Sequence, residues 1–63
     1  MSPLQASHLC EQCGYSVRFL PARQGRTEAL WLVRNAADWS AHTLPAGGRF
    51  TAPQLVAFAA ALP

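Results

Sequence analysis

The chain has 63 residues, of which 51% are hydrophobic and only 13% are charged, and its formal net charge is +2. This composition excludes a disordered, self-repelling chain, and the length suits one domain, which we expect to span residues 1–63. Globular domains usually carry about 25% charged residues, so we expect a partner to cover part of this weakly charged surface.

Residues 1–9 are expected to form an irregular arm. They lead into a tight turn over residues 10–14, in which Gly14 can take the positive φ that other residues avoid. Apolar and polar side chains alternate over residues 15–20, which is typical of a half-buried strand. Pro21 ends this strand, because proline cannot donate a ladder hydrogen bond.

The next apolar run predicts the second strand of an antiparallel hairpin, over residues 28–34. The run is short and rich in β-favouring side chains, and the first strand needs a pairing partner. A helix over residues 28–41 is the alternative, because the apolar side chains of this segment also fall on one helical stripe. A short third strand is considered near residues 42–44, before the chain-breaking segment 45–48.

A C-terminal helix over about residues 52–62 is the best-defined element. Thr51 and Gln54 have the spacing of a capping box, and Phe50 and Leu55 stand at the two positions of a hydrophobic staple. These elements together predict an α+β fold, a small domain in which the hairpin packs on this helix. The apolar stripe expected to face the sheet consists of Leu55, Phe58, Ala59 and Leu62.

The pattern Cys10-x-x-Cys13 is the most chemically specific motif in the chain. Such a turn lets two thiolates converge on one zinc ion. With the glycine and hairpin that follow, it resembles one knuckle of a zinc ribbon, although the second cysteine pair of a ribbon is missing. His8 and His42 are candidates to complete a structural zinc site, and Asp38 could replace either histidine. The alternatives are buried, reduced thiols or a redox pair.

The predicted C-terminal helix carries no charged side chain. A helix that is apolar all round is normally buried all round, which a domain of this size cannot easily achieve. We therefore expect it to dock on a partner or on a second copy of the chain, unless its alanines simply lie in water. Tryptophan is also enriched at interface hot spots, and we expect one buried and one partly exposed tryptophan. The candidate partner-binding residues are Trp31, Trp39, Val56, Ala57, Ala60, Ala61, Arg23 and Arg26.

All five basic residues are arginines. Arginine is better suited than lysine to bidentate contacts with phosphate and to stacking. A nucleic-acid-binding surface is therefore considered, in which arginines contact phosphates and an aromatic side chain stacks on bases. Its candidate residues are Arg18, Arg23, Arg26 and Arg34, with Tyr15 or Trp31 for stacking.

The sequence shows no paired carboxylates, nucleophile motif or phosphate loop, so we expect no enzymatic activity. The leading hypothesis is a small binding protein that docks on a larger protein or nucleoprotein complex as an accessory subunit or inhibitor. In size alone it is similar to inhibitors from phages and mobile elements, such as anti-CRISPR proteins. The alternative is a zinc-stabilised nucleic-acid-binding module. No targeting or membrane-spanning segment is recognisable, which favours a cytoplasmic location.

Overall fold

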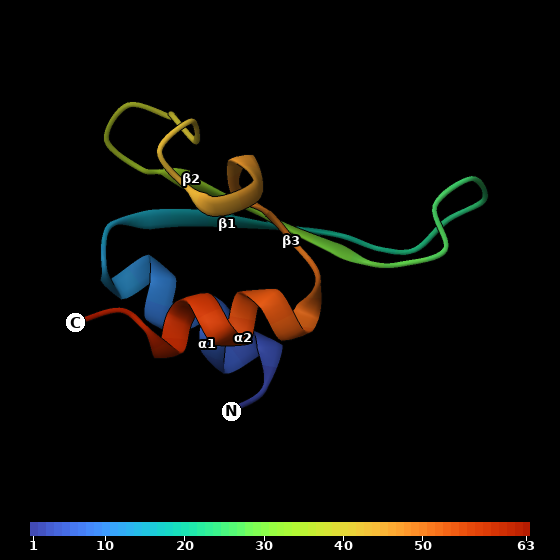
Figure 1. The fold of residues 1–63 in the computed structure, drawn as a ribbon, viewed down its shortest axis with the longest axis horizontal. Coiled ribbons are helices and arrows are strands. Elements are labelled where there is room, and N and C mark those ends of the chain that lie inside the picture. The colour runs from blue at the N-terminus through green and yellow to red at the C-terminus, as the bar shows by residue number, and fades with distance from the viewer.

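The computed structural model describes all 63 residues and shows two helices packed on one side of a small sheet (Figure 1). The fold is α+β, and its three strands form an antiparallel sheet in the order β1-β2-β3. Neither helix has the length and sustained hydropathy needed to cross a membrane. In chain order the elements are α1 (Pro3–Gln12), β1 (Tyr15–Leu20), β2 (Leu30–Asn35), the 3-10 turn η1 (Pro45–Gly48), β3 (Arg49–Phe50) and α2 (Ala52–Ala60).

The predicted hairpin is confirmed, and residues 30–35 are strand rather than helix. The hairpin strands β1 and β2 pair in register, so that Val17 lies opposite Val33 and Arg18 lies opposite Leu32. Because side chains alternate between the two faces of a strand, this register sorts the sheet into two faces. The face that carries Val17 and Val33 lies against the helices, and the other face carries Arg18 and Leu32.

The core lies between the sheet and the two helices. Leu55 of α2 is completely buried, and Val33 of β2 is 1% exposed. Full burial of a leucine side chain stabilises a fold by about 1.5–3 kcal/mol, a large share for so small a domain. Phe58 links α2 to the sheet, because its ring lies 5.5 Å from that of Tyr15 and 5.1 Å from that of Phe50. The buried apolar cluster consists of Ala6, Cys10, Val33, Leu44, Phe50, Leu55 and Ala59.

The first nine residues are not an irregular arm, because residues 3–12 form the helix α1. The side chain of Ser2 accepts a hydrogen bond from the backbone N–H of Gln5, and the side chain of Gln5 accepts one from the backbone N–H of Ser2. This reciprocal pair is a capping box, and Pro3 occupies the first turn, where it needs no hydrogen-bond partner. The helix buries Ala6 and Cys10.

The predicted C-terminal helix is confirmed over residues 52–60. Thr51 caps it, and the predicted capping box with Gln54 is present. Its predicted stripe faces inward, with Leu55 and Ala59 buried and Phe58 and Leu62 packed against the core. Thr51 is thus the N-cap and Ala52 the first helical residue, even though Pro53 disfavours a helical backbone at Ala52.

A third strand exists, but residues 42–44 do not form it. Arg49 and Phe50 pair with Leu32 and Trp31 of β2, on the edge that β1 leaves free. The segment before β3 must pass close to the backbone of β2, and Gly48 makes this approach. A Cβ atom at Gly48 would overlap the carbonyl oxygen of Val33. The predicted breaker is therefore the device that brings the third strand onto the sheet.

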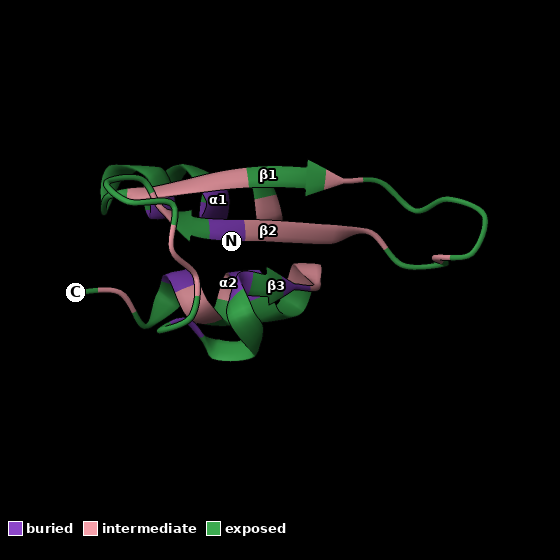
Figure 2. Cartoon of the chain, turned by 90° about the horizontal axis from the view of Figure 1, so that it is seen from above, coloured by how far each residue is buried: buried purple, intermediate pink, exposed green.

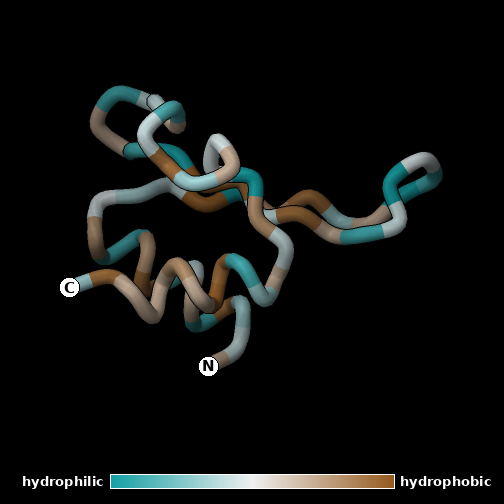
Figure 3. Tube along the Cα trace, in the orientation of Figure 1, coloured by the Kyte–Doolittle hydropathy of each residue, from teal (hydrophilic) through white to brown (hydrophobic).

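The far end of the hairpin projects beyond the helices (Figures 1 and 2). Buried segments lie in the two helices, in β2 and around β3, whereas the projecting end of the hairpin is intermediate or exposed (Figure 2). Arg23 and Arg26 exchange two backbone hydrogen bonds of 2.7 and 2.9 Å and close a tight turn. Hydropathy falls toward the tip of the hairpin, because both strands contain hydrophobic segments and the tip is hydrophilic (Figure 3).

Candidate functional site

Three arginines share the sheet face that is turned away from the helices. Arg18 on β1 and Arg49 on β3 both lie opposite Leu32, which places them on either side of this residue of the central strand. Arg34 follows Leu32 by two positions and therefore lies on the same face. We call these three arginines, together with Leu32 and Ser16, the arginine face. Arg18, Arg34 and Arg49 are all exposed.

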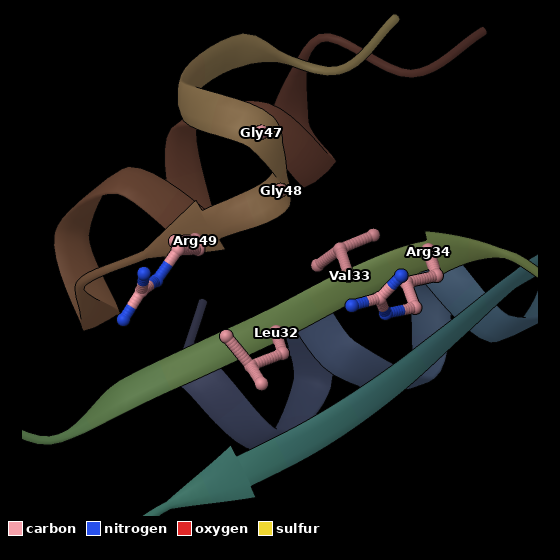
Figure 4. A pocket seen from close by; sticks show the side chains of 6 residues that line it. All are labelled: Leu32, Val33, Arg34, Gly47, Gly48 and Arg49. Atoms are coloured by element: carbon pink, nitrogen blue, oxygen red, sulfur yellow. The ribbon is translucent and has the colours of Figure 1, made fainter. Parts of the chain in front are cut away.

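Two hollows mark the arginine face. One, of about 100 Å³, is lined by five residues and lies between β1, β2 and the segment after β2. The other, of about 270 Å³, lies between β2 and the chain that enters β3 (Figure 4). Leu32 and Arg34 line both hollows, so the two adjoin each other across β2. The first is lined by Ser16, Arg18, Leu32, Arg34 and Trp39, and the second by Leu32, Val33, Arg34, Gly47, Gly48 and Arg49.

Trp39 lies at the edge of the arginine face in an unusual conformation. Its side chain is 64% exposed, although tryptophan is among the most apolar residues. Its φ angle is +60°, a left-handed conformation that costs a residue with a Cβ atom about 1–2 kcal/mol. The backbone N–H of Trp39 donates a hydrogen bond to the carbonyl oxygen of Asn35 over 2.8 Å, and the carbonyl oxygen of Trp39 accepts one from the side chain of Arg34. The surrounding hydrogen bonds thus hold an exposed indole beside the arginines.

The charge of the arginine face is not neutralised within the chain. The only two hydrogen bonds donated by arginine side chains go to main-chain carbonyl oxygens, from Arg34 to Trp39 and from Arg26 to Pro21. Asp38 is the carboxylate next to Trp39 in the chain, and it accepts a 3.0 Å hydrogen bond from the backbone N–H of Ser40. That bond, reinforced by the Ser40 side chain, lowers the pKa of the Asp38 carboxyl. The Asp38 carboxylate thus accepts hydrogen bonds within its own turn and pairs with none of the arginines.

The structure divides the four arginines that the sequence suggested for phosphate contact. Arg18 and Arg34 share the arginine face, whereas Arg23 and Arg26 lie in the turn at the tip of the hairpin. Arg49 joins the first group and had no place among the candidates. It could have been found only by recognising residues 49–50 as a strand, and a two-residue strand has no alternation to reveal it.

The aromatic residues suggested for stacking lie elsewhere. Tyr15 packs edge-on against Phe58, and Trp31 lies 4.7 Å from Phe19, measured between ring centroids. Both belong to the face that is turned toward the helices. Neither tryptophan is fully buried, contrary to expectation, because Trp31 is intermediate and Trp39 is exposed. Trp39 is the aromatic residue that lines a hollow with arginines.

The four residues suggested as zinc ligands are not brought together. No group of three or more histidine, cysteine, aspartate or glutamate side chains converges in the structure. Cys10 is completely buried on the inner side of α1, while Cys13 lies exposed at the end of that helix. His8 and His42 are both exposed. Burial raises the pKa of the Cys10 thiol, with smaller contributions from Cys13 and Glu11, so Cys10 is held as a neutral thiol.

A third hollow, away from the arginine face, lies along the outer side of α2. It has a volume of about 380 Å³ and is mainly apolar. Two of the residues suggested for partner binding, Ala57 and Ala61, contribute to it, whereas Ala60 is exposed outside it and Val56 packs against the core. The lining residues are Pro45, Ala46, Phe50, Gln54, Ala57, Phe58 and Ala61.

Comparison with known proteins yields no relative: no family model, no curated protein and no solved structure matches this chain.

Proposed function

We propose that this chain is a small non-enzymatic binding protein of the cytoplasm. In this proposal it docks through its arginine face on a negatively charged surface of a larger protein or nucleoprotein complex, as an accessory subunit or inhibitor. The observation that carries the proposal is the gathering of Arg18, Arg34 and Arg49 on one open sheet face, with none of them bonded to a carboxylate.

The distribution of charge supports this assignment over a general affinity for anions. The net charge is only +2, so the chain as a whole attracts polyanions weakly. Three of its five arginines nevertheless share one face, which concentrates the positive potential where a partner would meet it. Arginine also loses its hydration more easily than lysine does, and it forms bidentate contacts with carboxylate or phosphate.

Heparin chromatography of two double variants with equal charge tests the proposal. Arg18→Gln/Arg34→Gln removes two charges from the arginine face, and Arg23→Gln/Arg26→Gln removes two from the hairpin tip. Each pair also removes one arginine that bonds to a main-chain carbonyl oxygen, so the structural losses are matched. We expect the first variant to elute at clearly lower salt than the second, because only it disrupts the docking face. Equal elution of the two variants would contradict the proposal.

The apolar hollow on α2 supports a second candidate function, self-association through the C-terminal helix. The hollow presents mainly hydrophobic residues, and the exposed alanines of α2 would permit a second helix to approach closely. Native mass spectrometry of the protein and of Ala57→Glu tests this candidate. A dimer that the substitution abolishes supports it, and a monomer at all concentrations rejects it.

A further inference from the structure

We propose that the anionic partner of the arginine face is single-stranded nucleic acid, with one base stacked on Trp39 and the backbone phosphates held by Arg18, Arg34 and Arg49. This inference rests on the proposed docking face and adds its ligand. It differs from a stacking role for Tyr15 or Trp31, because those rings pack within the protein.

The first argument is the placement of the indole. Proteins that bind single strands combine a positively charged surface with aromatic side chains on which bases stack. Trp39 lines the same small hollow as Arg18 and Arg34, and its side chain is 64% exposed. An acidic protein surface would use the arginines equally well, whereas every base of a single strand brings a flat π-face that can stack on the indole. The combination therefore favours nucleic acid over an acidic protein.

The second argument is the conformation that holds the indole in place. Trp39 retains a left-handed backbone, with φ at +60°, although its side chain gains little burial in return. Strained residues of this kind persist where the surrounding structure fixes them, and they concentrate at binding sites. Here the fixing group is Arg34, which donates to the carbonyl oxygen of Trp39 over 3.0 Å. One residue thus provides a positive charge and orients the stacking platform.

The third argument is the shape and extent of the face. Arg18 and Arg49 lie on the two outer strands, so their backbones are roughly 10 Å apart, two strand spacings. Arg34 lies on the central strand two residues beyond Leu32, in one hollow with Arg49 (Figure 4) and in the other with Arg18. A duplex keeps its bases stacked inside and is read by an element that enters a groove. An open sheet face with one exposed indole at its edge fits an unstacked base instead.

Fluorescence anisotropy with a labelled 12-nucleotide single strand tests the inference, with a duplex of equal length and a poly-glutamate peptide as competitors. We expect the single strand to bind more tightly than either competitor. Three phosphate contacts predict that the logarithm of the binding constant falls with the logarithm of salt concentration at a slope of about −2. Replacing any one of the three arginines by Gln should reduce that slope by about 0.7.

Two substitutions at the indole separate stacking from charge. Trp39→Ala should weaken binding of the single strand by about 5- to 150-fold, the usual loss of one stacked base. Trp39→Phe should retain most of the affinity, because it keeps an aromatic face. Circular dichroism of both variants checks that they fold, and Arg23→Gln/Arg26→Gln serves as the control for charge away from the face.

The outcomes distinguish this inference from the proposed function. If poly-glutamate binds as tightly as the single strand and Trp39→Ala has no effect, the docking face stands and the nucleic-acid ligand is rejected. Tighter binding of the duplex likewise rejects the single strand as the ligand. If no polyanion binds and the arginine substitutions change nothing, both proposals fail.

Discussion

Arg34 donates a hydrogen bond from Nη1 to the main-chain carbonyl oxygen of Trp39 over 3.0 Å. The bond joins β2 to the segment that follows it, and Asn35, the last residue of β2, also bonds to Ser40 of this segment through its backbone and its side chain. An arginine on the open face of the sheet therefore fixes the loop that presents the exposed tryptophan.

The first prediction concerns this loop. Arg34→Lys keeps the charge but removes the planar guanidinium, which reaches a fixed acceptor better than an ammonium group does. We expect hydrogen exchange of the backbone amides of residues 39 and 40 to become faster. The matched control is Arg18→Lys, because Arg18 donates no hydrogen bond to this loop. Equal acceleration in both variants would show that Arg34 does not hold the loop.

The second prediction concerns the conformation of Trp39 itself. Trp39→Gly relieves a left-handed strain of about 1–2 kcal/mol and costs about 0.5–1 kcal/mol in the entropy of the unfolded chain. We therefore expect the free energy of unfolding to rise by up to about 1.5 kcal/mol, measured by urea denaturation, while binding of the single strand to the arginine face weakens as it does in Trp39→Ala. Ala46 has a φ of +53°, so Ala46→Gly is a control that should stabilise the fold without affecting binding. A stability loss on Trp39→Gly would show that the indole is part of the core.

The third prediction concerns the glycines that precede β3. Gly47 and Gly48 both have positive φ, but only at Gly48 would an added Cβ overlap the carbonyl oxygen of Val33. Gly47→Ala should cost about 1–2 kcal/mol from strain alone, and Gly48→Ala about 1–3 kcal/mol more from overpacking. A domain of this size has roughly 3–5 kcal/mol to lose. We expect circular dichroism to show Gly47→Ala folded and Gly48→Ala largely unfolded, and similar spectra for both would refute the packing argument.

Hydropathy pattern and capping signals were sufficient to predict the hairpin and α2. The same reasoning could have predicted α1, because Ser2-Pro3-Leu4-Gln5 has the spacing of Thr51-Ala52-Pro53-Gln54, and both segments form capping boxes. The Cys10-x-x-Cys13 pattern predicts a turn instead, although Cys10 lies inside the helix. The two local signals in residues 2–14 thus conflict, and the capping signal is the one that matches the structure.

The third strand and the binding face could not be predicted in this way. β3 has two residues and is held by the approach of Gly48 to β2, a tertiary contact that leaves no periodic pattern. The arginine face depends on that strand, because Arg49 joins Arg18 only when β3 pairs with β2. Likewise, the placement of Trp39 depends on the hydrogen bond that its backbone N–H donates to the carbonyl oxygen of Asn35 and on the one that its carbonyl oxygen accepts from Arg34.

The fourth prediction tests the two caps. Removing a capping hydroxyl leaves a helix N–H without its partner and typically costs about 1 kcal/mol. We expect Ser2→Ala and Thr51→Ala each to lower the melting temperature by roughly 4–8 °C, the shift expected for 1 kcal/mol in so small a domain. Thr27→Ala is the control, because Thr27 is exposed in the hairpin loop and caps no helix. An equal shift in the control would mean that the hydroxyl groups act in another way.

The fifth prediction separates the two cysteines. Cys13 is exposed and Cys10 is buried, so a thiol reagent at neutral pH should modify Cys13 rapidly and Cys10 only on unfolding. A chelator should leave this difference unchanged, because core packing alone protects Cys10. If the chelator exposes Cys10, or if zinc raises the melting temperature and protects both thiols, a metal site exists that the geometry of the chain does not account for.

The raised pKa of Cys10 adds a dependence of stability on pH. Below pH 9.0, the ordinary pKa of the thiol, Cys10 is protonated in both folded and unfolded chains and its contribution to stability is constant. Above that value the unfolded chain loses the proton while the folded chain retains it, so the unfolded state binds fewer protons and stability falls as pH rises. We expect urea denaturation of Cys13→Ala to show this fall between pH 8 and 10 and Cys10→Ala to show much less of it. An equal slope in the two variants would show that the alkaline loss of stability does not come from Cys10.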